Sequence, residues 1–238
     1  LVLTALGGAE ARALPAGFTD QVVLSGLTNP TAIRFAPDGR VFVAQKSGII
    51  LVYASLTSAP TVFADLRTDV YDYWDRGLLG LAVDPQWPTR PYVYALYTRD
   101  AVPGGSSPRW NDACPNPTSE SAANGGCLAT SRLVRLTATF PPGGGNPTAT
   151  APSAQTVLIT DWCQMYPSHS AGDLRFGPDG YLYATGGDGA SFGNYDYGQF
   201  PTAAPNQCGD PYNPSASPPV LEGGMVRAQD LDTSGDPA

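Results

Sequence analysis

One short pattern occurs three times in this chain, and it limits the fold more than any other feature of the sequence. Residues 33–44 and 174–185 each hold an apolar run, a Pro-Asp-Gly turn and a second apolar run, and 81–97 is a looser copy. Tight turns favour Pro, Asp and Gly, so each copy predicts a β-hairpin. The chain is therefore expected to consist of repeated antiparallel hairpins.

The composition decides how these hairpins can be covered. Of 238 residues, 27 are Gly and 24 are Pro, which excludes helix bundles and coiled coils. The expected strands 41–44, 92–97 and 181–184 are apolar on both faces, so both faces of their sheets should be covered. Because helices are lacking, the cover has to be another sheet, and hairpin sheets stacked around an axis make a β-propeller. A β-sandwich is the alternative, although a sandwich sheet normally leaves one face in water.

About three hairpin units fit this chain, whereas a propeller needs at least four blades to close. We therefore expect an all-β chain in which 14–238 forms part of a ring, with the remaining blades as its partner. Residues 1–13 are expected to be an N-terminal arm or a signal remnant, because Ala11-Arg12-Ala13 has the small-x-small form of a cleavage site.

The charge balance argues against nucleic acid as a partner. The chain has 13 Lys and Arg against 21 Asp and Glu, a net charge of -8, and Lys46 is its only lysine. It therefore has no basic face that could neutralise a phosphate backbone. No apolar run approaches the roughly 20 residues of a transmembrane helix, so no membrane span is predicted.

Four cysteines allow three pairings, and their positions favour one of them. Cys114 and Cys127 bracket a segment rich in Pro, Asn, Ser and Gly, within an expected surface loop at about 101–128. A disulfide there would restrain a segment that buries little apolar surface. Cys163 and Cys208 would form the second pair. Disulfides imply an oxidising compartment, so a secreted, extracellular or periplasmic location is predicted.

His169 is the only histidine, and it stands just before the third hairpin. Asp188 follows that hairpin, so both residues are expected at the same end of it. A carboxylate beside an imidazole fixes its tautomer and stabilises its protonated form, which a general base requires. The glycines flanking Asp188 are expected to leave space for a flat ligand. A purely structural histidine is the alternative.

The third candidate element is Asp75-Arg76-Gly-Leu-Leu-Gly, a charged pair that enters a buried strand. A surface ion pair would be its simplest role. Taken together and in this order, this motif, His169-Ser-Ala-Gly and Gly187-Asp188-Gly resemble the soluble quinoprotein glucose dehydrogenase and glucose/sorbosone dehydrogenase family. The resemblance covers about 14–191.

The resemblance implies a six-bladed propeller of which this chain supplies about the N-terminal half, or roughly three blades. It implies pyrroloquinoline quinone (PQQ) and calcium as cofactors and a small sugar as substrate. His169 would take the proton of the sugar hydroxyl as hydride passes to the quinone, and Asp188 would support it. Asp75 and Arg76 would form the pocket wall beside the cofactor.

The family's calcium ligands and its quinone-holding arginines and lysine belong to later blades, so no metal ligand is assigned in this chain. The family also includes non-catalytic members. A secreted propeller that serves as a binding or structural module in an extracellular assembly is therefore the alternative function.

Overall fold

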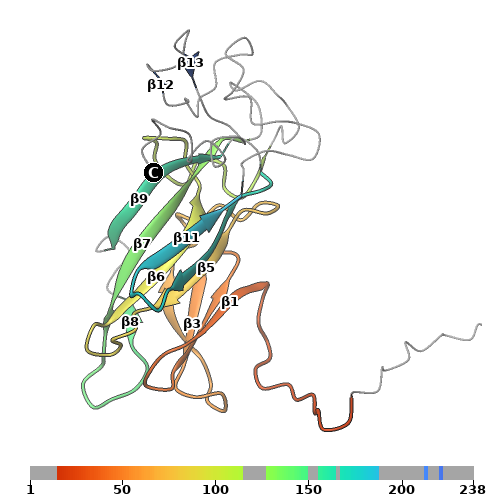
Figure 1. The fold of residues 1–238 in the computed structure, drawn as a ribbon, viewed down its shortest axis with the longest axis vertical. Helices are drawn as coiled ribbons and strands as arrows, with labels where there is room; N and C mark the ends of the chain where they lie inside the picture. The colour runs from red at the N-terminus through yellow and green to blue at the C-terminus, as the bar shows by residue number, and fades with distance from the viewer. Residues whose placement is uncertain are drawn as a thin grey trace, which may run out of the picture.

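The protein folds into β-sheets joined by turns and loops (Figure 1). The computed structural model describes residues 15–114, 127–149, 155–164, 167–187, 212–213 and 220–221. These ranges contain no helix, and they therefore contain no helix that is long and apolar enough to cross a membrane. The all-β prediction is confirmed.

The first sheet is a four-stranded antiparallel meander. Its strands follow the chain order: β1 (Pro30–Phe35), β2 (Val41–Gln45), β3 (Ile49–Tyr53) and β4 (Thr61–Asp65). The predicted Pro-Asp-Gly turn joins β1 to β2 and sets a register in which Phe35 pairs with Val41. Local turn chemistry therefore places the first hairpin as the sequence predicts.

The second sheet repeats this meander, and a third begins after it. The second holds β5 (Leu78–Val83), β6 (Tyr92–Arg99), β7 (Ala129–Thr139), β8 (Thr148–Ala149) and β9 (Thr156–Gln164), with β8 and β9 both paired to β7. The third holds β10 (Ala171–Phe176) and β11 (Leu182–Gly186). Two short strands, β12 (Tyr212–Asn213) and β13 (Val220–Leu221), pair with each other.

The sheets stack face to face through their first strands. Both β1 and β10 pack against β5, so the second sheet lies between the other two. Arg34 of β1 reaches β10, where it pairs with Asp173 and donates to the Leu174 carbonyl at 3.2 Å. Three successive sheets in this order are consecutive propeller blades, not the two layers of a sandwich.

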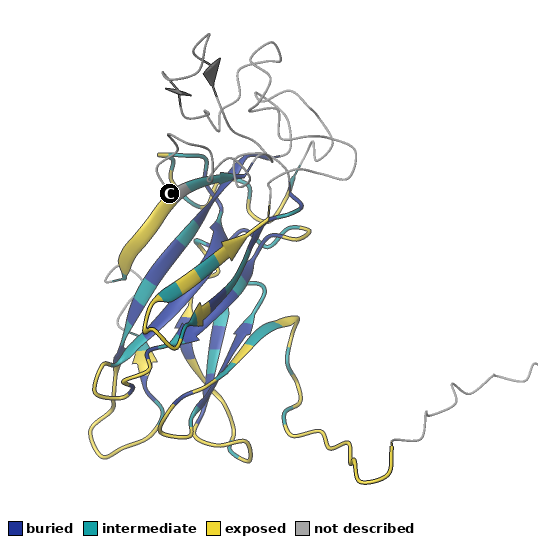
Figure 2. Ribbon diagram, in the orientation of Figure 1, coloured by how far each residue is buried: buried dark blue, intermediate teal, exposed yellow. Residues whose placement is uncertain are grey.

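Apolar side chains fill both spaces between the sheets, and buried residues are concentrated in the central strands, for example β2, β6 and β7 (Figure 2). Between the first and second sheets, the Phe42 ring meets the Phe63 and Trp87 rings edge-on at 5.2 and 5.3 Å. Tyr94 and Phe176 make a similar contact at 5.4 Å between the second and third. Each buried side chain of this size contributes about 1.5–3 kcal/mol.

The strand β11 is covered on only one face within the described residues. It was expected to be covered on both faces, yet Tyr183 of β11 is 54% exposed and Tyr181, just before it, is 72% exposed. Side chains alternate along a strand, and Leu182 and Ala184 point the other way, into the core with the second sheet. In the described residues, the face that carries the two tyrosines is therefore open, and its cover by a further blade stays a prediction.

Asp69 lies in the segment between β4 and β5, and its carboxylate binds side chains of the second sheet and of the loop that follows β6. It accepts hydrogen bonds from the Tyr97 hydroxyl at 2.6 Å and from Arg99 Nε at 2.9 Å. Ser107 Oγ and Arg132 Nη1 donate to it as well. Burial acts to raise the pKa of Asp69, but the hydrogen bonds from Ser107, Tyr97 and Arg99 outweigh burial and hold it below the usual range. The folded state therefore favours the ionised carboxylate.

Asp69→Asn is expected to lower the free energy of unfolding by about 1–3 kcal/mol at pH 7, because hydrogen bonds to a charged group are lost. The folded pKa is depressed, so the stabilisation is complete above the unfolded pKa of about 3.9 and is lost as pH falls through the folded pKa. Urea unfolding at a series of pH values measures this difference. Asp65→Asn is the matched control, because its ion pair with Arg67 is exposed and should contribute less than about 1 kcal/mol. Equal losses for both variants would contradict the prediction.

Candidate functional site

A tight turn at the start of the Asp-Arg-Gly-Leu-Leu-Gly motif carries two of the candidate residues. The Arg76 N–H donates to the Tyr73 carbonyl at 2.9 Å, so Trp74 and Asp75 form the tip of the turn. Asp75 is exposed, and its N–H donates to the Pro167 carbonyl at 3.2 Å. The turn is thereby tied to the segment that holds the histidine.

The structure brings Asp75 and His169 together although 94 residues separate them in the sequence. The His169 N–H donates to Asp75 Oδ2 at 3.4 Å. His169 is half-buried, and its backbone is left-handed with a φ of 52°. A non-glycine residue rarely adopts this conformation, and such strain often accompanies function. The two motifs therefore meet at one end of the stacked sheets.

The third motif begins at the same place. The Gly187 N–H donates to the Ser170 carbonyl at 2.7 Å, at the open end of the β10–β11 hairpin. Gly187 thus lies against the backbone that leads from His169 into β10. Asp188, the predicted partner of His169, lies outside the described residues, so its role stays a prediction.

The glycines beside Asp188 were expected to leave space for a flat ligand. Around Gly187 that space is filled by the protein, because a Cβ there would collide with the His169 carbonyl group. A Cβ on the neighbouring Gly186 would collide with the Trp162 ring. Both glycines are therefore required by internal packing, and the expectation of ligand space beside Asp188 stays a prediction.

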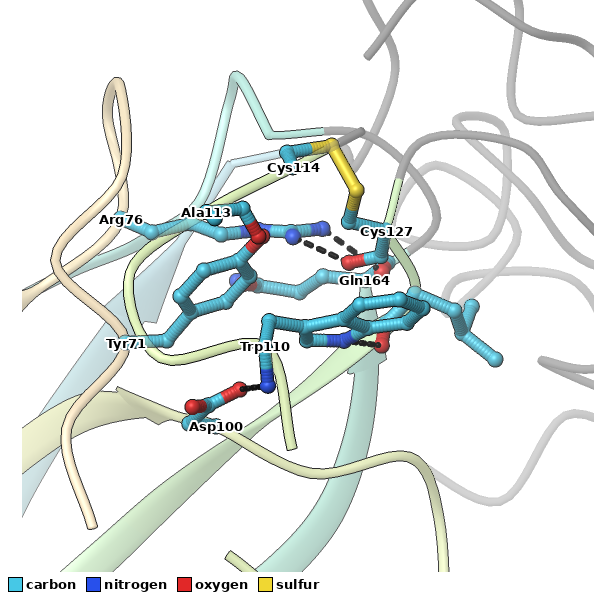
Figure 3. Close-up of a disulfide and its surroundings, with 9 residues drawn as sticks. Tyr71, Arg76, Asp100, Trp110, Ala113, Cys114, Cys127 and Gln164 are labelled. Atoms are coloured by element: carbon cyan, nitrogen blue, oxygen red, sulfur yellow. Dashed lines mark hydrogen bonds between the residues drawn. A yellow bond between two sulfur atoms is a disulfide. The ribbon is translucent and has the colours of Figure 1, made fainter. Parts of the chain in front are cut away.

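Arg76 turns away from the surface. Its side chain is fully buried, and its guanidinium donates to the carbonyls of Cys127 and Gln164, the latter at 3.1 Å (Figure 3). The guanidinium carbon lies 5.1 Å from the centre of the Tyr71 ring. Burial lowers the pKa of Arg76 to about 10, so the group is still charged at neutral pH. A surface ion pair is excluded, and the predicted contact of Arg76 with a cofactor stays a prediction.

The predicted disulfide closes the loop above this buried arginine. It joins Cys114 to Cys127 (Figure 3), and the two Cα atoms are 5.5 Å apart. The Tyr71 hydroxyl donates to the Ala113 carbonyl at 2.9 Å, and burial raises the pKa of Tyr71. By loop closure, this bridge should contribute about 3 kcal/mol. Cys163 is disulfide-bonded too, and Cys208, its predicted partner, lies outside the described residues.

Lys46, the only lysine, also contacts residues on both sides of the turn, Asp72 and Leu78. Lys46 Nζ pairs with the Asp72 carboxylate, and the Lys46 carbonyl accepts from the Leu78 N–H at 2.8 Å. Gly77, with a φ of 141°, packs so closely on Lys46 that a Cβ would lie 2.7 Å from the Lys46 carbonyl oxygen. The motif therefore needs its first glycine for packing against the first sheet.

The left-handed residues gather around this turn. The non-glycine residues with positive φ in the described chain are Asn29, Trp74, Asn111, Asp112, Cys127 and His169. Asp112 Oδ1 accepts a hydrogen bond from the Asp72 N–H. The Cys127 carbonyl accepts one from the Arg76 guanidinium, and the His169 N–H donates one to Asp75 Oδ2. Sequence motifs alone did not single out Trp74, because nothing in its spacing marks a bulky residue with a left-handed backbone.

The described residues contain no group of three or more His, Cys, Asp or Glu side chains that could hold a metal ion. At this end of the sheets, here called the rim, they offer the His169 imidazole, the exposed Asp75 carboxylate and the exposed Trp74 indole. Such a set can accept a proton, bind hydroxyl groups and stack on a ring.

Stacked hairpin sheets with a polar rim of this kind define a β-propeller protein that carries a candidate site at one end. The sequence pattern of the Glucose / Sorbosone dehydrogenase family matches residues 27–203. The chain therefore belongs to this family, which confirms the resemblance of the three motifs.

Among curated proteins, the chain is 28% identical to human Hedgehog-interacting protein over 182 residues, which are 72% of this chain and 22% of that protein. The mouse protein is 27% identical over 179 residues. The chain thus spans about a fifth of the length of these relatives.

Among solved structures, an oxidoreductase (glucose dehydrogenase) from Thermus thermophilus is 28% identical, with a TM-score of 0.45, over 71% of this chain and 39% of that one. The PQQ-bound aldose sugar dehydrogenase from Streptomyces coelicolor is 20% identical, with a TM-score of 0.49, over 77% and 44%. The chain spans less than half of either structure.

Proposed function

We propose that the complete protein oxidises a hydroxyl group of a sugar and transfers the hydride to PQQ, with His169 as general base. The observation that supports this most directly is the 3.4 Å hydrogen bond from the His169 N–H to Asp75 Oδ2. It joins two of the family's motifs at a rim that solvent reaches. Asp188, the residue after Gly187 in the sequence, would support the imidazole.

In this proposal, each residue of the chain has a separate task. The imidazole of His169 takes the hydroxyl proton while the carbon–hydrogen bond breaks and a carbonyl forms. The exposed Asp75 carboxylate orients the sugar by accepting hydrogen bonds from the hydroxyl groups of the sugar. The backbone contacts of Pro167 and Ser170 fix the position of the histidine. PQQ, when bound, supplies the acceptor for the two electrons.

The described residues fit one part of such a site. PQQ carries carboxylates, which cations would have to bind, yet Arg76 is held by carbonyls and Lys46 by Asp72. The rim residues instead suit the sugar and the reacting face of a ring. We therefore propose that the cations for PQQ and the ligands for calcium come from the remaining blades of the ring.

A non-catalytic binding module is the second candidate function. The similarity to Hedgehog-interacting protein over 72% of this chain favours it. In that case, the same rim would contact a partner in an extracellular assembly, and no electron transfer would occur. The disulfide between Cys114 and Cys127 suits a secreted or periplasmic protein under either function.

One assay separates the two functions. The complete protein is loaded with PQQ and calcium, and reduction of an artificial electron-accepting dye is followed with D-glucose and other aldoses. We expect sugar-dependent dye reduction that requires PQQ. Absence of both PQQ binding and dye reduction would support the binding module.

A further inference from the structure

The tip of the turn holds a bulky residue where glycine would fit best. Trp74 occupies the second position of the turn closed by Arg76 and Tyr73, and its φ is 51°. Asp75, at the third position, has no positive φ. This combination is typical of a type II′ turn, whose second position favours glycine. A tryptophan there carries a backbone cost of about 1–3 kcal/mol, which points to a use for its side chain.

A ladder of rings supports the indole from one side. The Trp74 and Tyr73 rings are stacked, with centres 6.0 Å apart and planes 8° from parallel. Tyr73 stacks in turn on the buried Tyr71, also at 6.0 Å and within 18°. Trp74 is nevertheless 52% exposed. The protein therefore fixes the orientation of the ring and leaves much of its surface in solvent.

The groups around the indole indicate the kind of ligand. Asp75 is the next residue, it is exposed, and a carboxylate can accept several hydrogen bonds. Asp72 lies two residues before Trp74 and brings a second acidic group, which is paired with Lys46. An anionic ring system such as a quinone carboxylate would meet the negative charge of Asp75. A saccharide ring is neutral, stacks its C–H face on an aromatic ring and donates hydroxyl protons to a carboxylate.

We propose that Trp74 is the stacking platform of a saccharide subsite, with Asp75 as its hydroxyl acceptor. The proposal rests on the proposed function, because it assigns a specificity-determining residue at the same rim. It would place the sugar ring beside His169, whose N–H holds the Asp75 carboxylate. The same subsite could bind a saccharide without oxidising it.

Trp74→Gly provides the sharpest test, because glycine suits the left-handed turn position and the variant should fold normally. The complete protein is titrated with D-glucose, maltose and cellobiose, without PQQ, and Kd is measured by calorimetry. We expect Trp74→Gly to raise Kd by about tenfold or more, and Trp74→Phe to stay within about threefold of the wild type. Tyr181→Ala, which removes an exposed ring near the Pro-Asp-Gly turn at the other end of β10–β11, should leave Kd unchanged.

The outcomes for this subsite and for the proposed oxidation can be told apart. If no saccharide binds the wild type, or if Trp74→Gly binds saccharides as the wild type does, the subsite is wrong. If dye reduction depends on His169 while KM is the same in Trp74→Gly, the oxidation stands and the subsite falls. If saccharides bind through Trp74 and no dye is reduced, the subsite stands and the oxidation falls.

Discussion

His169→Asn is expected to reduce kcat for dye-linked sugar oxidation by about 10²–10⁴-fold, the usual contribution of a positioned general base. Asparagine cannot take the hydroxyl proton, yet it tolerates a left-handed backbone better than most residues. The φ of 52° at position 169 can therefore be kept, along with the hydrogen bond from its N–H to Asp75. The change removes the base and leaves the architecture of the rim in place.

The measurement combines turnover with stability. The free energy of unfolding of His169→Asn should differ from the wild type by less than about 1 kcal/mol, whereas His169→Ala should lose more, because alanine disfavours a positive φ. PQQ binding should be similar in the wild type and in His169→Asn. If kcat of His169→Asn remained within a few-fold of the wild type, another group would have to be the base.

The hairpins were predictable from the sequence because their turns are local. Pro-Asp-Gly between two apolar runs sets both the turn and the register, and β1–β2 and β10–β11 pair as expected. That only one face of β11 is covered within the described residues was not predictable, because an apolar run looks the same whether or not a second sheet covers it. Tyr183 shows why: its hydroxyl donates to Asp179 at 2.6 Å in solvent, which no periodicity reveals.

The site could be predicted only in part. Motif resemblance pointed to Asp75 and His169, and the structure shows that the His169 N–H donates to the Asp75 carboxylate. The motif resemblance could not predict that Arg76 faces inward, because the arginine is held there by carbonyls of residues 127 and 164, which are far away in the sequence. Nor could it single out Trp74, whose importance lies in a φ value and a stacked ring. Long-range contacts and backbone angles carry this information, and a single sequence does not display them.

Arg76 holds three parts of the rim together. It follows Asp75 directly, it binds the Cys127 carbonyl at the end of the disulfide loop, and it binds the Gln164 carbonyl at the end of β9. The Gln164 side chain in turn accepts from the Thr98 hydroxyl at 3.0 Å on β6. A single guanidinium with a planar set of donors can serve two carbonyls at once, which a lysine cannot do in the same geometry.

Arg76→Met is therefore expected to lower the free energy of unfolding by about 2–5 kcal/mol. Methionine keeps much of the side-chain volume, so the loss comes mainly from two buried carbonyls without their donor, each costing about 1–3 kcal/mol. Relief of the desolvated charge offsets part of this cost. Urea unfolding measures the change, with Arg67→Met as the matched control, because Arg67 is exposed and its pairing with Asp65 contributes less than about 1 kcal/mol.

A double-mutant cycle shows whether the arginine and the disulfide act as one unit. Cys127 supplies both a sulfur of the bridge and a carbonyl that accepts from Arg76, so removing the bridge should also loosen that carbonyl. The loss in a protein that combines Arg76→Met with Cys114→Ser and Cys127→Ser should then be smaller than the two separate losses added together, by about 0.5–3 kcal/mol. Strict additivity would mean that Arg76 and the disulfide stabilise the rim independently. A coupling of the expected size would mean that the disulfide acts through Cys127 and Arg76 on the turn that presents Asp75 to His169.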